Sequence, residues 1–357
     1  LVYCCFGGKF MKILKKIQNI KEINREVQNE FQNRLDKIMK PVKSLGRLET
    51  IGAQIAGIKE TCNYSVKKRK HFVFAADNGV EVEGVSSCPR EFTRLVSESM
   101  LSGTGAIAIL CKTHNVDFSL VDIGIDGKIK GKYSNFINKK IAYGTKNLRN
   151  ESAMSLEEVY KGFEISFDLV KKAKKKYSIL SCGEMGIGNT TSSACLIYKI
   201  LGGDVDTIVG LGSGINSETL QHKKMIIEKA CERVKSQNIY EILAELGGYD
   251  LAGMTGFYLA CAYYRVPVIL DGYISLAAAL VAYKINPKVK DFLIPSHQTE
   301  EKGSMLVYEH LNITPFLYMN MCLGEGTGSV LVYPILDSIK PIYKKMLTKD
   351  EVYKRYN

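Results

Sequence analysis

Apolar residues recur at helical spacing near the N-terminus and in short blocks farther along the chain. Seven of them fall on one helical face, namely Ile17, Ile20, Ile23, Val27, Phe31, Leu35 and Ile38. This spacing predicts one amphipathic helix from Ile17 to Met39, whose apolar side needs a partner surface. A turn then leads into a second predicted helix from Arg47 to Ile58, with Ser44 as a candidate cap.

Short apolar blocks alternate with helical stretches over most of the remaining chain. The predicted strands are His71 to Ala76, Phe118 to Ile123, Ser178 to Cys182, Asp206 to Gly210, Pro267 to Leu270 and Phe292 to Pro295. The predicted helices include Leu156 to Lys176, Ala194 to Leu201 and Met254 to Tyr264. This alternation predicts an α/β fold with a mainly parallel sheet covered by helices on both faces. A ligand is then expected along the carboxyl ends of the strands.

Composition agrees with an α/β enzyme and weakens a nucleic-acid interpretation. Of the 357 residues 46% are hydrophobic and 24% are charged, with 31 glycines and only 8 prolines. The net charge of +12 comes largely from separated lysine runs, such as residues 67–70, without interleaved aromatic residues. We therefore expect a solvated basic surface and no nucleic-acid partner. Such a surface weakly favours an anionic small substrate.

Other sequence features argue against a membrane segment, a disulfide framework and a metal site. The longest apolar stretches, Leu251 to Tyr264 and Val266 to Tyr283, are interrupted by charges and are too short to span a bilayer. The ten cysteines are scattered, which fits reduced thiols in a cytoplasm. The five histidines show no metal-ligand spacing, so we expect no metal. We interpret residues 1–10 as an upstream extension.

A glycine-rich stretch between a predicted strand and a predicted helix is the first candidate site. Gly186 and Gly188 lie at the turn, where glycine allows backbone N–H groups to face one anion near the positive end of the helix. An ordinary turn capped by Asn189 or Thr190 is the alternative. Glu184 favours a functional site, because a carboxylate in a phosphate loop is unfavourable unless it orients or catalyses.

Three further positions have both a functional and an ordinary interpretation. Asp77 follows a predicted strand, so it is either a site residue or a hydrogen-bonded turn aspartate. A second glycine cluster, residues 210–214, precedes a helix in which Lys223 could reach a phosphate or simply be solvated. Glu325 has glycines on both sides, which leaves room for a ligand but is equally compatible with a surface turn.

Taken in order, seven motifs resemble the nicotinate-nucleotide:dimethylbenzimidazole phosphoribosyltransferase family of cobalamin biosynthesis. They are Ser44-Leu-Gly-Arg-Leu-Glu, Ala76-Asp-Asn-Gly-Val with Glu83-Gly-Val-Ser, Gly183-Glu-Met-Gly-Ile-Gly-Asn-Thr-Thr, Gly210-Leu-Gly-Ser-Gly, Asp271-Gly-Tyr-Ile-Ser, Ser296-His-Gln and Leu323-Gly-Glu-Gly-Thr-Gly. The resemblance runs from about Ser44 into the C-terminal helix.

The resemblance implies a Rossmann-like large domain, a small helical domain built from both chain ends, and a homodimer. We expect the large domain over residues 67–336 and the small domain over 11–66 and 337–357. It implies transfer of phosphoribose from nicotinate mononucleotide to dimethylbenzimidazole or a related base, without a cofactor. Glu325 is the implied general base. The implied substrate-binding residues are Glu184, Gly186, Gly188, Asn189, Gly212, Ser213, Gly214, Lys223, Asp77, Ser86, Arg90 and Leu323.

Two positions depart from the family pattern, and two other functions compete with this interpretation. The family usually has histidine at the position of Asn78 and commonly glutamine at that of Arg90, in the segment that leads to the base pocket. Met100, Leu323 and the stem of Arg90 are expected to line that pocket. A phosphoribosyl pyrophosphate enzyme would need an acidic pair before a Thr-Gly-Gly-Thr-like loop, which is absent from the sequence. A non-catalytic nucleotide-binding protein would not need Glu325.

Overall fold

The fold is built on a six-stranded sheet in which every neighbouring pair is parallel. The computed structural model describes residues 8–210, 214 and 216–357. The strand order is β3-β2-β1-β4-β5-β6. These strands are β1 (Arg69–Ala76), β2 (Asp117–Gly124), β3 (Phe136–Asn138), β4 (Ile179–Met185), β5 (Val268–Leu270) and β6 (Leu293–Pro295). A second parallel pair joins β7 (His297–Thr299) to β8 (Leu317–Met321). The expected parallel α/β fold is confirmed.

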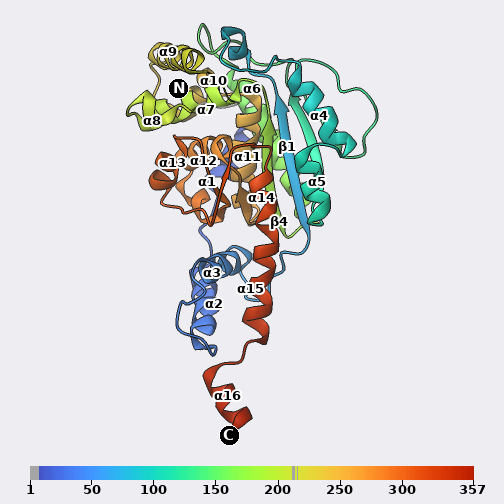
Figure 1. Ribbon diagram of the computed structural model, residues 1–357, viewed down its shortest axis with the longest axis vertical. Helices are drawn as coiled ribbons and strands as arrows, with labels where there is room; N and C mark the ends of the chain where they lie inside the picture. Colours follow the sequence, from blue (N-terminus) through green and yellow to red (C-terminus); the bar gives the residue numbers. More distant parts are fainter. Residues whose placement is uncertain (1–7, 211–213, 215) are drawn as a thin grey trace.

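Helices cover both faces of the sheet, as Figure 1 shows around β1. Side chains alternate along a strand, so Phe72 and Phe74 enter one core and Val73 and Ala75 the other. The first face carries α6 (Leu156–Ala173), α7 (Asn189–Leu201), α11 (Tyr249–Tyr263) and α12 (Tyr273–Ile285), with α9 (Ser217–Arg233), α10 (Ile239–Leu246) and α13 (Ser304–Leu311) beside them. The second face carries α4 (Phe92–Ser102), α5 (Ala106–Thr113) and α14 (Thr327–Leu331).

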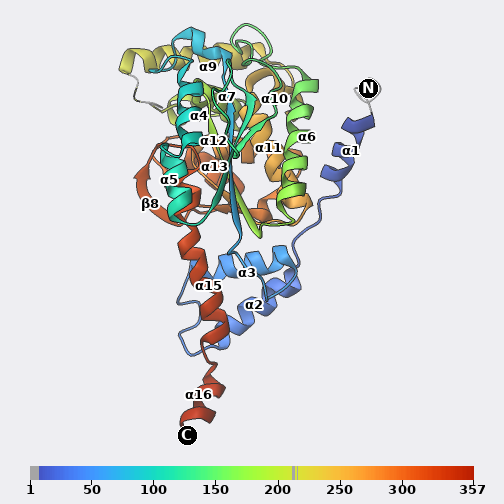
Figure 2. The same cartoon turned by 90° about the vertical axis from the view of Figure 1, so that its right-hand side faces the viewer.

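Segments from both chain ends form a helical group below the sheet in Figures 1 and 2. It consists of α2 (Arg25–Lys37), α3 (Arg47–Lys59) and α15 (Tyr333–Lys345), with α16 (Lys349–Tyr356) beyond them. The rings of Phe31 and Tyr343 stack with centroids 4.0 Å apart, which joins α2 to α15. Helix α1 (Gly8–Gln18) lies elsewhere, on α6, where Phe10 meets Tyr160.

Two predictions for the N-terminal segment were wrong. The expected helix from Ile17 to Met39 is broken, because α1 ends at Gln18 and the side chain of Asn24 caps α2. Ile20 lies in the non-helical segment between the two helices and is buried all the same. Its apolar side chain therefore fitted the helical spacing although the backbone there is not helical. Ser44 does not cap α3, since that helix follows Gly46 and has no side-chain cap.

The predicted strand from Asp206 to Gly210 was also wrong. Residues Val205–Ile208 form the short helix α8, and the side chain of Asp204 accepts a hydrogen bond from the backbone N–H of Asp206. A short apolar run is compatible with either structure, and here a local cap favours the helix. Two short 3-10 helices, η2 (Gly79–Glu83) and η3 (Pro287–Phe292), complete the elements. None of the helices in the described ranges is long and apolar enough to cross a membrane.

Candidate active site

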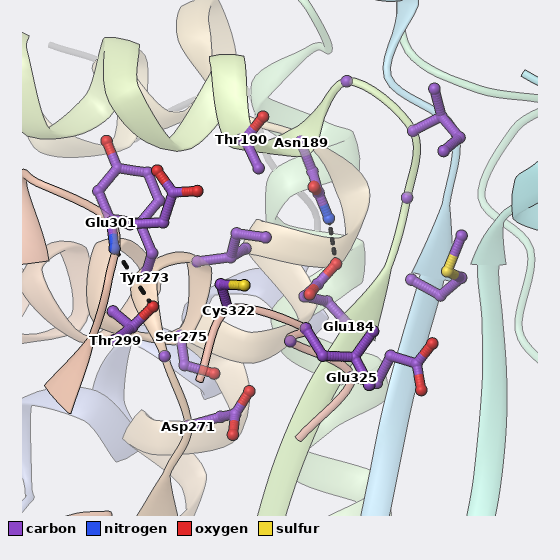
Figure 3. A pocket seen from close by; sticks show the side chains of 18 of the residues that line it. Glu184, Asn189, Thr190, Asp271, Tyr273, Ser275, Thr299, Glu301, Cys322 and Glu325 are labelled. Carbon is purple, nitrogen blue, oxygen red and sulfur yellow. Dashed lines mark hydrogen bonds between the residues drawn. The ribbon is translucent and has the colours of Figure 1, made fainter. Parts of the chain in front are cut away.

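A cavity of about 280 Å³ lies at the carboxyl ends of β4 and β5. Figure 3 shows polar side chains entering it from several elements. Its acidic side chains are Glu184, Asp271, Glu301 and Glu325, and its apolar ones include Phe92, Val96, Met185, Ile187 and Leu323. The cavity therefore combines a wall suited to a flat apolar ring with a wall rich in hydrogen-bonding groups.

The loop between β4 and α7 supplies a site for an anion. Gly188 has a φ of 90°, a left-handed conformation, and α7 begins directly after it without a side-chain cap. Lys223 Nζ donates a hydrogen bond to Thr190 Oγ1 at 3.0 Å in the first turn of α7. Burial lowers the pKa of Lys223, and the charge of Glu301 opposes this shift. A helix N-terminus beside a buried lysine can hold a phosphate.

Gly186 has a different reason to be glycine from the one that the sequence suggested. A Cβ atom there would lie 2.3 Å from the carbonyl oxygen of Ala76 and 2.9 Å from Asp250 Oδ2. The missing side chain therefore lets the loop pack against the end of β1. The space of the missing side chain is filled by atoms of Ala76 and Asp250, so Gly186 allows the loop to pack closely against them.

Two buried carboxyl groups share one amide beside the cavity. Asn189 Nδ2 hydrogen-bonds to Glu184 (Figure 3) and, at 3.0 Å, to Asp250 Oδ2. Burial, reinforced by the charge of Asp250, raises the pKa of Glu184 to about 8. Burial also raises the pKa of Asp250 to about 6. The pair therefore holds at least one proton over part of the neutral range, and Asn189 keeps Glu184 in place.

Glu325 occupies a strained turn in the cavity wall. Its φ is 61°, and those of Gly324 and Gly326 are 84° and 89°, so three successive residues are left-handed. Burial, helped by the charge of Asp271, raises the pKa of Glu325, whereas a hydrogen bond from the backbone N–H of Ile107 lowers it. The carboxyl groups of Glu184 and Glu325 point apart in Figure 3.

One oxygen of Glu325 lacks a hydrogen-bond partner in the described structure. Oε2 of Glu325 is buried and has no hydrogen-bond partner within the ranges that the structure describes. A buried carboxylate oxygen without a donor is unfavourable. A ligand N–H group beside it would satisfy it, and a raised pKa makes the same oxygen a better proton acceptor.

Asp271 supports this turn from the end of β5. Its Oδ2 accepts a hydrogen bond from the backbone N–H of Gly326 at 3.1 Å, and its Oδ1 accepts one from that of Ser329 at 3.2 Å. Asp271 therefore satisfies backbone donors at the start of α14. This bonding fixes the segment that follows Glu325.

The other predicted site residues fall into two groups. Ser86 and Leu323 line the cavity, and Leu323 is 58% exposed. Arg90 is not among the described residues that line it, because its guanidinium pairs with Asp126 at 2.9 Å and with Glu81. Met100 is buried in the second core instead.

Asp77, Gly210 and Gly214 are not among the described residues that line the cavity. Asp77 is buried, and its Oδ2 accepts a hydrogen bond from the backbone N–H of Asp126 at 2.7 Å. This bonding matches the alternative of a hydrogen-bonded turn aspartate. Asn78 accepts a hydrogen bond from Ser192 Oγ at 3.1 Å. Gly214 is exposed with a φ of 85°, whereas Gly212 and Ser213 lie outside the described residues.

Sequence reasoning missed several residues that the fold brings to this site. They are Asp250, Thr190, Tyr273, Ser275, Thr299, Glu301 and Cys322. Asp250 comes two residues after the pair Gly247-Gly248, and a Cβ atom on Gly248 would clash with its side chain. This glycine pair is the sequence feature that could have indicated a close approach at Asp250. In the described part of the chain no group of three or more His, Cys, Asp or Glu side chains could hold a metal ion.

Comparisons with known proteins identify the family of this chain. A family described as phosphoribosyltransferase matches residues 20–352. The chain is 39% identical to the nicotinate-nucleotide:dimethylbenzimidazole phosphoribosyltransferase of Clostridium perfringens, over 94% of this chain and 93% of that protein. It is 40% identical to the enzyme of that name from Clostridium tetani, over 96% and 95% of the two chains.

A solved structure gives the same result in three dimensions. The crystal structure of the nicotinate-nucleotide:dimethylbenzimidazole phosphoribosyltransferase from Thermus thermophilus superposes with a TM-score of 0.87 and 31% identity. The superposition covers 93% of this chain and 99% of that chain. The chain therefore belongs to the phosphoribosyltransferase family, together with these nicotinate-nucleotide:dimethylbenzimidazole phosphoribosyltransferases.

Proposed function

We propose that the protein transfers the phosphoribosyl group of nicotinate mononucleotide to dimethylbenzimidazole or a related base. The products are nicotinate and an α-ribazole 5′-phosphate for assembly of the cobalamin nucleotide loop. One observation carries the proposal: the N-terminus of α7 and Glu325, whose Oε2 has no hydrogen-bond partner among the described residues, line the same cavity. A phosphorylated donor and a nitrogenous acceptor can therefore bind side by side.

The donor binds through its phosphate at the α7 end of the cavity. Backbone N–H groups after Gly188 and the hydroxyl of Thr190 face the anion. Lys223 is not among the described lining residues, but its ammonium donates to the Thr190 hydroxyl and adds positive charge beside the anion. Glu184 then lies near the ribose, where it accepts or donates a hydrogen bond according to its protonation state. Asn189 and Asp250 hold Glu184 in position.

The reaction needs a base more than an acid. The pyridinium nitrogen of the donor is positively charged, so breaking its bond to ribose C1′ leaves the bonding electron pair on neutral nicotinate nitrogen. One nitrogen of the benzimidazole forms the new bond to C1′ while the other loses its proton to Glu325. Attack opposite to the leaving group inverts the β-nucleotide to the α-riboside. A positioned carboxylate of this kind contributes roughly a hundredfold to ten-thousandfold.

The acceptor lies against the apolar wall formed by Phe92, Val96 and Leu323. A flat ring in this place turns one edge toward Glu325. Ser86 also lines this region and offers a hydroxyl group to the ring. An apolar wall distinguishes weakly between rings that differ by one methyl group, so related bases are also expected substrates.

A direct assay tests this function. Purified protein is mixed with nicotinate mononucleotide, with and without dimethylbenzimidazole, and nicotinate and riboside phosphate are quantified. We expect equal amounts of both products, and only when the base is present. Absence of nicotinate release would contradict the proposal, as would release that does not need the base. A non-catalytic nucleotide-binding protein would bind the donor without forming either product.

Domain organisation and assembly complete the proposal. We propose that residues 11–66 and 337–357 contribute the small helical domain and that residues 67–336 form the catalytic one. Within the first range, the part that belongs to α1 packs on α6 of the catalytic domain instead. The packing of α2 and α3 against α15 supports a unit built from both chain ends. Met39, Val42 and Leu45 of this unit are exposed apolar side chains, which supports the proposal of a homodimer. The buried free thiols, such as those of Cys111 and Cys182, fit a cytoplasmic location.

A further inference from the structure

A buried chain of polar side chains ends at the backbone of Glu325. Tyr333 OH donates a hydrogen bond to Ser181 Oγ at 3.0 Å. Ser181 Oγ lies 2.7 Å from His71 Nδ1, and His71 Nε2 lies 3.1 Å from the carbonyl oxygen of Glu325. Tyr333, Ser181 and His71 are fully buried and come from α15, β4 and β1. None of them lines the cavity as far as the structure describes it.

The hydrogen bonds that link Tyr333, Ser181 and His71 to the Glu325 carbonyl can run in only one direction. Burial lowers the pKa of His71 to about 3, so the ring is neutral and carries a single N–H. The carbonyl oxygen of Glu325 can only accept, which places that proton on Nε2. Nδ1 therefore accepts from the Ser181 hydroxyl, and Ser181 accepts from Tyr333. Each donor and each acceptor along the chain is matched.

The peptide unit between Glu325 and Gly326 is also held at its N–H group and by close packing against its backbone. Asp271 accepts from the N–H of Gly326, as described above, while His71 donates to the preceding carbonyl. A Cβ atom on Gly183 would lie 2.3 Å from the carbonyl carbon of Glu325. One on Gly326 would lie 2.0 Å from His71 Cε1. The surroundings thus hold Glu325 in a left-handed conformation that the residue does not favour by itself.

We propose that Tyr333, Ser181 and His71 form a positioning relay that fixes the Glu325 peptide and thereby aims its carboxylate at the acceptor base. His71 and Ser181 are positioning residues, since neither reaches the cavity. The proposal rests on the proposed role of Glu325 as the general base. A displacement of about 1 Å at a reacting group can lower a rate by about a hundredfold, so small shifts of this peptide matter.

Ser181→Ala is the sharpest single test. It removes the donor to His71 Nδ1, so that this buried nitrogen loses its hydrogen bond and the ring is no longer fixed in its orientation toward the Glu325 carbonyl. We expect kcat to fall at least tenfold while KM for nicotinate mononucleotide stays within about twofold. Ser166→Ala is the matched control: Ser166 is equally buried, and its Oγ donates to the carbonyl of Gly253 at 2.6 Å between α6 and α11. That control should keep kcat unchanged.

A double-mutant cycle separates positioning from general loss of packing. In a Glu325→Gln background, Ser181→Ala should lower kcat no further, because no base remains to be aimed. Equal fractional losses in both backgrounds would overturn the relay. If Ser181→Ala does not fold, Tyr333→Phe takes its place, with a smaller loss and the same dependence on Glu325.

The two proposals fail in different ways in this cycle. If Glu325→Gln keeps the kcat of the unaltered protein, the proposed base is wrong. If Glu325→Gln lowers kcat and both Ser181→Ala and Tyr333→Phe leave it unchanged, only the relay is wrong.

Discussion

The Nε2 atom of His71 lies 3.1 Å from the carbonyl oxygen of Glu325, although 254 positions separate the two residues in the chain. This contact joins the central strand β1 to the glycine-flanked turn in the cavity wall. A left-handed glutamate costs about 1 to 2 kcal/mol relative to ordinary conformations. The rigid core of the sheet therefore maintains a strained backbone at the residue that the proposed chemistry needs most.

The pH dependence of turnover should follow the ionisation of Glu325. Burial raises its pKa above the ordinary value of about 4.3, and only the deprotonated form accepts a proton. We expect kcat to rise with pH through a midpoint above that value. The measurement is kcat from pH 4.5 to pH 8 in the unaltered protein and in Glu184→Gln. The rise should persist in Glu184→Gln, and its loss there would assign it to Glu184 instead.

Lys223→Met should weaken donor binding selectively. Loss of the ammonium beside Thr190 removes one charged partner of the phosphate, so KM for nicotinate mononucleotide should increase about tenfold or more. KM for dimethylbenzimidazole should change little. Lys224→Met is the control, because Lys224 is the next residue but pairs with Asp206 at 2.5 Å. Equal increases in both Michaelis constants for Lys223→Met would argue against a phosphate site at α7.

Gly188→Ala should impair both stability and donor binding. A Cβ atom at a φ of 90° is strained, by about 1 to 2 kcal/mol, and here it would lie 3.1 Å from the carbonyl oxygen of Asn78. Gly203→Ala provides the comparison, with a φ of 99° and open space around its Cβ. Thermal unfolding should show a lower Tm for both variants. Only Gly188→Ala should raise KM for the donor, and an unchanged KM would remove the loop from the site.

The buried acid pair should make stability fall with rising pH. The pKa of Glu184 is raised to about 8 and that of Asp250 to about 6, so the folded protein retains protons that the unfolded chain releases. This contribution is fully present below the unfolded values of about 4 and is lost as pH rises through the folded ones. Denaturant unfolding of Glu184→Gln should show a smaller loss of unfolding free energy between pH 5 and pH 8.

Ser166→Ala supplies the control for this titration, because it alters a buried side chain without removing a titratable group. It should leave the slope of unfolding free energy against pH unchanged. A Glu184→Gln variant whose slope equals that of the unaltered protein would mean that Glu184 is not held protonated in the fold.

The sequence predicts the parallel sheet well because its strands are short apolar blocks that end at glycine or aspartate. His71 to Ala76 and Ser178 to Cys182 are adjacent strands in the structure. Asp206 to Gly210 has the same appearance, yet Asp204 caps a helix there. Local capping and tertiary packing decide such short runs, and periodicity alone cannot.

Site residues that lie beside glycines could be predicted from the sequence. Those that reach the site only through contacts between distant segments could not. Glu184, Asn189 and Glu325 adjoin glycines that allow a close approach of backbone or ligand. Asp250 and His71 act through contacts with residues 61 and 254 positions away. No local pattern encodes such a distance. Arg90 was misplaced for the same reason, because its acidic partner Asp126 lies in another loop.

The most direct test of the account is the single-turnover rate of Glu325→Gln. The variant and the unaltered protein, each in molar excess over nicotinate mononucleotide, are mixed with it and with saturating dimethylbenzimidazole, and riboside phosphate is quantified over time. The account predicts a rate at least a hundredfold lower, with donor affinity retained, because only the proton acceptor is lost. A variant that forms the product at nearly the unaltered rate would contradict it.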